Sequence, residues 1–202
     1  MKRRQLGLAV ASLALAMPFA ARADITEVGG VKYENAVTVA NAKLQLNGAG
    51  IRYKYVVKVY TAGLYLPAKA TTSEAVYAAS GPRRIHIVML REINADELGK
   101  LFTRGMEQNL SREEFAKVIP AVIRMSDVFS MRKRLLPGEG FTIDYLPGTG
   151  SIITINGQRV PEPIKEPEFY NALMKIWLGK SPADSQLKDA LLGKNAAKDP
   201  FN

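Results

Sequence analysis

The sequence predicts a mixed α+β fold, because its parts follow different hydrophobic periods. The N-terminal half consists of β-prone segments separated by glycine, whereas the middle has helix start signals followed by apolar residues three and four positions apart. Strand-like segments then return before two closing helices. Runs of strands beside runs of helices are typical of α+β folds rather than of regularly alternating βα units.

The first 23 residues predict a secretory signal peptide. Lys2-Arg3-Arg4 precedes an apolar run from Leu6 to Ala16, and Ala21-Arg22-Ala23 supplies small residues at a cleavage site. The run is shorter than the roughly 20 residues that a membrane-spanning helix needs. We therefore expect cleavage after Ala23 and a periplasmic protein with no stable membrane insertion, with an uncleaved anchor as the alternative.

The remaining chain has the length of one domain, which we assign to residues 24–193, with residues 194–202 as a flexible tail. It contains no cysteine, which excludes disulfides, thiolate metal sites and thiol catalysis. The formal charge of +9 includes four cations in the first 23 residues and no acid there, so the mature chain carries 9 − 4 = +5. That balance suits an anionic small molecule or a membrane surface, and without a clustered basic tract we expect no nucleic-acid partner.

Several strands are predicted in order along the first half. Segments 25–28 and 31–33 flank Gly29-Gly30, a good two-residue hairpin turn. A strand at 43–46 leads into the β-prone segment from Asn47 to Pro67. Residues 84–90 carry apolar side chains on both faces, which indicates a strand that is covered on both sides.

The second half begins with two predicted helices. Asn94 with Glu97, and Ser111 with Glu114, have the spacing of capping boxes. The second helix should bury one stripe of residues: Phe115, Val118, Ile119, Val122 and Ile123. Strands at 141–145 and 152–155 follow, and then a helix that contains Trp177 and a last helix capped near Asp184.

The segment from Asn47 to Pro67 carries more positive charge than a strand needs for its stability. Counted as one straight strand, it places the following side chains on a single face: Arg52, Lys54, Val56, Lys58 and Tyr60. This face is either solvated surface or a binding site for an anion. Arginine matches a carboxylate with two parallel hydrogen bonds, and a tyrosine hydroxyl adds a neutral donor. Because eight residues of straight strand span about 26 Å, Arg52 and Tyr60 can hold one carboxylate only if the chain bends between them.

Other catalytic and cofactor motifs are missing from the sequence. The single histidine, His86, cannot build a metal cluster, and no Gly-x-Ser-x-Gly motif is present. Gly48-Ala49-Gly50 lacks the third glycine and the following helix of a dinucleotide-binding loop. We therefore predict no catalytic residue, no metal and no cofactor.

Two segments resemble the chalcone isomerase-like family, in its exported bacterial branch: Asn47-Gly48-Ala49-Gly50-Ile51-Arg52 and Lys58-Val59-Tyr60-Thr61-Ala62-Gly63-Leu64-Tyr65-Leu66. Shorter matches follow at Pro137-Gly138, Tyr145-Leu146-Pro147-Gly148, Ile176-Trp177-Leu178-Gly179 and 187–193, so that the resemblance covers most of residues 28–193. It implies an open-faced β-sandwich, in which a layer of helices covers a long antiparallel sheet and a ligand cleft lies between them.

The resemblance also bears on the chemistry. Plant chalcone isomerases use an arginine, a threonine, and a helical tyrosine and asparagine. Here Arg52 matches the arginine, Tyr60 stands at the threonine position, and Leu98 and Gly105 stand at the tyrosine and asparagine positions, with Asn109 one turn later. Leucine and glycine can neither orient a phenoxide nor polarise a ketone. The plant fatty-acid-binding members of this fold retain the arginine and a tyrosine, as Arg52 and Tyr60 do.

From these observations we predict a non-catalytic protein that binds a fatty acid or a similar hydrophobic carboxylate, with Arg52 as anchor and Tyr60 as second donor. The alternatives are an intramolecular lyase acting on a chalcone-like phenolic enone, and an envelope interaction protein with a vestigial cleft. The sequence does not name a protein partner.

Overall fold

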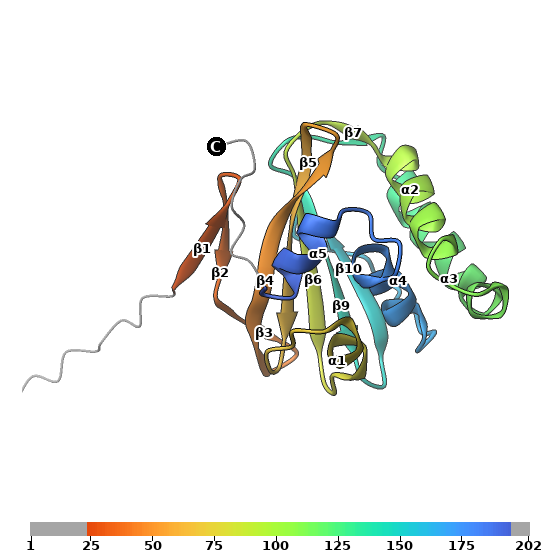
Figure 1. Cartoon of the computed structure of the whole chain (residues 1–202). Helices are drawn as coiled ribbons and strands as arrows, with labels where there is room; N and C mark the ends of the chain where they lie inside the picture. Colours follow the sequence, from red (N-terminus) through yellow and green to blue (C-terminus); the bar gives the residue numbers. More distant parts are fainter. Residues whose placement is uncertain (1–23, 195–202) are drawn as a thin grey trace, which may run out of the picture.

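The structure is a computed structural model that describes residues 24–194. The predicted signal peptide and most of the predicted tail lie outside the described residues. Lys194, the one tail residue that is described, donates its backbone N–H to the Asp189 carbonyl. The centre of this range is a seven-stranded antiparallel sheet with five helices on one face and a small hairpin on the other, as Figure 1 shows. This is the α+β architecture that the sequence predicts.

The strands of the central sheet follow the order β11-β10-β9-β6-β5-β4-β3. Their bounds are β3 (Ala36–Val39), β4 (Ala42–Lys54), β5 (Val57–Leu66), β6 (Arg83–Met89), β9 (Gly140–Leu146), β10 (Gly150–Ile155) and β11 (Gln158–Arg159). Two further pairs form outside it: β1 (Ile25–Val28) with β2 (Val31–Glu34), and β7 (Ile93–Asn94) with β8 (Arg134–Leu135).

The β1–β2 hairpin turns at Gly29-Gly30, as predicted, and both glycines have positive φ. It forms its own small sheet across the face opposite the helices. The Tyr33 hydroxyl donates to Thr61 Oγ1 at 2.7 Å. The Tyr33 ring lies edge-to-face with the His86 ring, with the ring centroids 5.4 Å apart. The hairpin therefore covers the second face of β5 and β6, which confirms that the strand at 84–90 is covered on both sides.

The β-prone segment from Asn47 to Pro67 forms two strands rather than one. Its chain reverses in a two-residue turn at Tyr55-Val56, where Tyr55 has a φ of +58°, and Lys54 then pairs with Val57. The single charged face counted along a straight strand is therefore wrong. The sequence concealed this turn, because tyrosine and valine favour strands and the positions that favour a hairpin turn usually hold Asn or Gly.

Five helices pack on the other face of the sheet: α1 (Ser73–Ala78), α2 (Ala95–Glu107), α3 (Arg112–Ser130), α4 (Phe169–Leu178) and α5 (Ser185–Leu191). The predicted caps are present. Asn94 accepts from the backbone N–H groups of Asp96 and Glu97, and Ser111 forms a reciprocal capping box with Glu114. Helix α1 and strand β3 were not predicted.

The buried stripe of α3 differs in part from the prediction. Val118 and Val122 are buried as expected, but Ile119 and Ile123 are 41 % and 55 % exposed. Helix α3 contacts α2 and α4, and its buried stripe continues instead to Met125 and Phe129. A helix at the edge of the helical layer buries only a narrow stripe of side chains. Ile119 and Ile123 lie about 100° around the helix axis from Val118 and Val122, so they fall outside that stripe.

The main core lies between the sheet and the helices. Trp177 of α4 is fully buried there, and Phe102 of α2 meets its ring edge-on with a centroid distance of 5.6 Å. Large aromatic side chains contribute most of the buried apolar area of such a core. The cavity described next lies at the border of this core, beside the β4–β5 hairpin.

Candidate functional site

A cavity of about 110 Å³ opens between the β4–β5 hairpin, α2, α4 and the loop before α5. Its polar lining consists of Arg52, Tyr60, Arg104, Gln108 and Ser181. The rest of the lining is apolar or glycine: Val59, Ile93, Leu98, Leu101, Phe102, Gly105, Ile176 and Ala183. A mostly apolar cavity with a few polar groups is the usual form of a small-molecule site.

The hairpin brings Arg52 and Tyr60 together. They are direct partners in the β4–β5 register, so the seven intervening residues form the two arms and the turn of a hairpin instead of separating them. The register then skips Val59, since Tyr60 pairs with Arg52 and Lys58 with Tyr53. A bulged strand points two successive side chains to similar sides, and both Val59 and Tyr60 line the cavity. The bend that the sequence required is therefore a turn together with a bulge.

The residues before Arg52 fix β4 against α5. A Cβ atom on Gly48 would lie 1.9 Å from the Ala190 carbonyl oxygen, and one on Gly50 would lie 2.6 Å from the Ala190 Cβ. Only glycine permits this approach of helix to strand. The Asn47 amide donates to the Leu191 carbonyl at 2.7 Å. The Asn-Gly-Ala-Gly motif thus has a packing role. By fixing β4 against α5, it also fixes the position of Arg52 relative to that helix.

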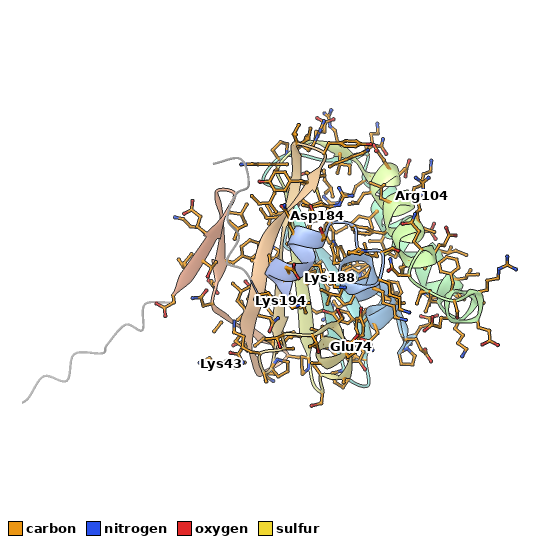
Figure 2. The ribbon with its side chains drawn as sticks, viewed as in Figure 1. Lys43, Glu74, Arg104, Asp184, Lys188 and Lys194 are labelled. Atoms are coloured by element: carbon orange, nitrogen blue, oxygen red, sulfur yellow. The ribbon has the colours of Figure 1, made fainter. Side chains whose placement is uncertain are left out.

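The end of β4 next to the hairpin turn is attached to α5 as well. Asp184, the N-cap of α5, accepts from the backbone N–H of Tyr53 at 2.8 Å and from those of Gln186 and Leu187. Figure 2 labels Asp184 at the start of α5 and Arg104 on α2. The carboxylate is therefore committed to backbone donors, and it is not part of the cavity lining.

Tyr60 is buried and keeps a proton that it can donate. Its hydroxyl oxygen accepts from Trp177 Nε1 at 2.8 Å, and no acceptor for its own proton lies among the described residues. Burial raises the pKa of Tyr60 to about 12, although the Arg52 charge and the Trp177 hydrogen bond oppose this shift. The hydroxyl is thus a neutral donor over the physiological pH range.

Arg52 is half-buried, and its side chain has no hydrogen-bond partner among residues 24–194. Its guanidinium carbon lies 5.7 Å from the centroid of the Tyr60 ring, and it forms no ion pair with any residue in the range 24–194. Lys54 and Lys58 are exposed on the arms of the hairpin and do not line the cavity. The structure therefore places the two predicted site residues together on the cavity wall and leaves the two lysines outside it.

Arg104 is a second cation at the cavity, and the sequence reasoning missed it. It is exposed on α2, and its side chain forms no ion pair within the described part of the chain. The spacing of Leu98, Leu101, Gly105 and Gln108 on α2 could have indicated it, because these residues share one helix face that lines the cavity. Arg104 borders that face.

The helical wall is apolar at the two positions where plant chalcone isomerases have a tyrosine and an asparagine. Leu98 and Gly105 both line the cavity. Asn109, one turn later, uses its amide group to bind the Gly105 and Ser181 carbonyls and the Ser181 N–H. It holds α2 against the loop before α5 and is not part of the lining.

A family model for chalcone isomerase-like proteins matches residues 25–193. The chain belongs to this family. No curated protein matches the sequence. Among solved structures, a fatty-acid binding protein from Arabidopsis thaliana is similar, with a TM-score of 0.63 and 14 % identity over 82 % of this chain and 93 % of that one. At that identity the likeness establishes the chalcone isomerase-like fold of the chain.

Two kinds of feature are absent from the described residues. Within residues 24–194, no three His, Asp or Glu side chains are grouped so that they could hold a metal ion. None of the described helices is long and apolar enough to cross a bilayer.

Proposed function

We propose that this chalcone isomerase-like protein binds a hydrophobic carboxylic acid of the fatty-acid type, with its head group at Arg52 and Tyr60. The observation that carries the proposal is an arginine that forms no ion pair within the described part of the chain, beside a neutral hydroxyl donor, both at an apolar cavity. A carboxylate could accept from both groups, and such charge-assisted bonds are about twice as strong as neutral ones. The fatty-acid binding protein of similar fold supports the same ligand class.

The size of the cavity limits what it holds. An apolar cavity of about 150 Å³ is large enough for benzene, and sites for drug-sized ligands measure about 300–1,000 Å³. At about 110 Å³, the present cavity suits the carboxylate and the first few carbons of an acid. A long acyl chain needs more room, which a movement of α2 away from α4 would provide. Leu101 of α2 and Ile176 of α4 line the cavity on these two sides.

The apolar α2 wall favours binding over isomerisation. A chalcone isomerase reaction needs groups that orient a phenoxide and polarise a ketone, and Leu98 and Gly105 supply neither. Incubation with a panel of chalcones tests this alternative. Cyclisation faster than the spontaneous background would assign an enzymatic role instead.

Native mass spectrometry of protein purified from the periplasm tests the proposal. We expect a co-purifying acid that is lost in Arg52→Ala, with affinity for added acids falling roughly 10- to 100-fold, because one charge-assisted hydrogen bond contributes about 1.5–3 kcal/mol. Lys54→Ala is the matched control, since it removes a cation two residues away that does not line the cavity. It should retain the acid.

Two results would contradict the proposal. One is a ligand-free wild-type protein whose melting temperature does not change when acids of several chain lengths are added. The other is equal loss of the acid in Arg52→Ala and Lys54→Ala. The same preparation tests the proposed export, because the intact mass of the processed chain should correspond to a start at Asp24.

A further inference from the structure

We propose a second binding surface, at the end of the molecule where the β4–β5 hairpin turns, and we infer that its partner is an anionic lipid bilayer. This tip surface comprises residues 54–58 and 91–92 together with Lys133, Arg134 and Leu136. It lies outside the cavity lining, so the inference goes beyond the proposed acid-binding site.

The hairpin turn exposes apolar side chains that nothing in the described chain covers. Tyr55 is 90 % exposed, Val56 71 % and Val57 40 %, and Lys54 and Lys58 flank them. Tyr55 also has a φ of +58°, a conformation that disfavours a bulky side chain and favours Asn or Gly. An aromatic residue here neither stabilises the turn nor buries area in the fold. We therefore assign Tyr55 a role in a contact outside the molecule.

A second group of exposed cations with an apolar residue lies at the same end of the molecule as the hairpin turn. The backbone N–H of Leu90 donates to the Val59 carbonyl, so the pairing of β5 with the chain after β6 continues toward the short β7–β8 pair. Figure 1 shows the hairpin turn and β7 at the same end of the molecule. Beside that pair, Arg91, Lys133 and Arg134 are exposed, together with the apolar Leu136.

The positive charge of the tip surface indicates an anionic partner. The surface carries five cations and one acid, Glu92, which lies 3.5 Å from Arg134. Three further acids border it: Glu139, which accepts from the Leu136 backbone N–H at 2.8 Å, and Asp96 and Glu97 on the first turn of α2. Tyrosine concentrates at membrane interfaces, where its ring and hydroxyl meet both phases, and each Lys or Arg near an anionic surface adds attraction. Aromatic and aliphatic residues between lysines thus fit a bilayer surface better than a protein pocket. On docking, the mouth of the cavity would lie close to the lipid, because Arg52 leaves β4 two residues before Lys54.

Flotation with lipid vesicles tests the inference. Vesicles of phosphatidylcholine mixed with phosphatidylglycerol should bind the wild-type chain, with binding that weakens as salt is added, and vesicles of phosphatidylcholine alone should bind it far less. The double variant Tyr55→Asn and Val56→Ser should lower the partition coefficient roughly tenfold. Because asparagine suits the positive φ, this variant should fold at least as well as wild type. Lys54→Glu should have a similar effect, which high salt should remove.

Controls separate the tip from other causes of binding. Ile123→Ser alters an exposed apolar residue of α3 and should bind as wild type does. All variants carry the same N-terminal segment, and intact mass records its processing, so any contribution from that segment is common to them.

Three outcomes would overturn the inference: no binding to anionic vesicles, binding that the tip variants do not alter, or a dimer in sedimentation that the double variant dissolves. The last result would assign the surface to a second copy of the chain. Acid retention by the double variant in native mass spectrometry is independent of these outcomes. Failure of the bilayer proposal and failure of the acid-binding proposal are therefore distinguishable.

Discussion

Two arginines in this protein lie against tyrosine rings, and they differ in what their donors do. Arg83 is 4 % exposed and lies between Tyr145 and Tyr170, at 4.5 and 5.0 Å from the ring centroids. Its Nη1 donates to two backbone carbonyls and to the Asn171 amide oxygen. Arg52 lies against one ring, is half-buried, and has no such partners within residues 24–194.

The difference shows how the same pair of residue types serves two purposes. A guanidinium whose donors are used inside the fold stabilises the fold, because its removal takes a donor away from several acceptors in the interior. A guanidinium whose donors face a cavity adds little to stability and remains available to an anion. The presence of an Arg–Tyr contact alone therefore does not identify a binding site, whereas donors that face a cavity do.

The sharpest test replaces each arginine with methionine. Arg83→Met should lower the free energy of unfolding by about 3 kcal/mol, because the Val76 carbonyl, the Tyr77 carbonyl and the Asn171 amide oxygen each lose one charged donor in the interior. Arg52→Met should change it by less than about 0.5 kcal/mol, as is usual for a residue without specific partners. Urea denaturation of both variants measures the contrast. Equal destabilisation would mean that Arg52 is a structural residue and would break the comparison.

The tyrosines allow a second test of the same idea. Tyr60→Phe leaves the buried Trp177 N–H without an acceptor and should cost about 2 kcal/mol of unfolding free energy. Tyr170→Phe should cost less than about 0.5 kcal/mol, because the Tyr170 hydroxyl has no hydrogen-bond partner in the described structure. Thermal melts of the two variants decide this. A larger loss in Tyr170→Phe would show that its hydroxyl has a role the contacts do not explain.

The cavity next to Arg52 can be enlarged at a smaller cost. Leu101→Ala should lower the free energy of unfolding by about 1–2 kcal/mol, below the range for fully buried leucines because Leu101 is half-buried. It should also shift binding toward longer acids, as measured by competition between acids of different chain length. Leu110→Ala is the control, since Leu110 is half-buried but does not line the cavity. An identical shift in both variants would mean that Leu101 does not limit the cavity.

The smallest expected effect is a dependence on pH that involves neither arginine. Burial lowers the pKa of His86, the only histidine in the chain, below its usual value of 6.5. The unfolded chain therefore binds a proton at higher pH than the folded chain does, and the free energy of unfolding should fall as pH decreases from about 7 to about 5. Denaturation across this range should show the slope in wild type and not in His86→Gln. A slope that persists in His86→Gln would point to other groups.

Local chemistry made much of the fold predictable. The Gly29-Gly30 turn, the Asn94 cap and the Ser111–Glu114 capping box each depend on residues within a few positions, and each appears where predicted. The turn at Tyr55-Val56 was hidden because its residues favour strands. Helix α3 showed the same limit, since which of its apolar residues are buried depends on how far α2 and α4 extend over it.

The site shows the same division. Arg52 and Tyr60 stood out in the sequence as a charge and a phenol that a strand does not need, and the family resemblance pointed to the same residues. Arg104 did not stand out, because one cation on an amphipathic helix is ordinary, and its place at the cavity follows from how α2 packs.

The sequence by itself determined most of the element types, the α+β class, the family and the residues on which a binding hypothesis rests, because all of these follow from side-chain type and local spacing. Only the tertiary structure decided that Arg52 faces Tyr60 across a hairpin and that Leu98 and Gly105 form an apolar wall of the same cavity. It also decided that Arg83 donates to three acceptors inside the fold, whereas Arg52 has no such partner among the described residues. The physical reason is that burial and hydrogen-bond satisfaction depend on which distant segments meet. Residue type alone does not specify those tertiary contacts.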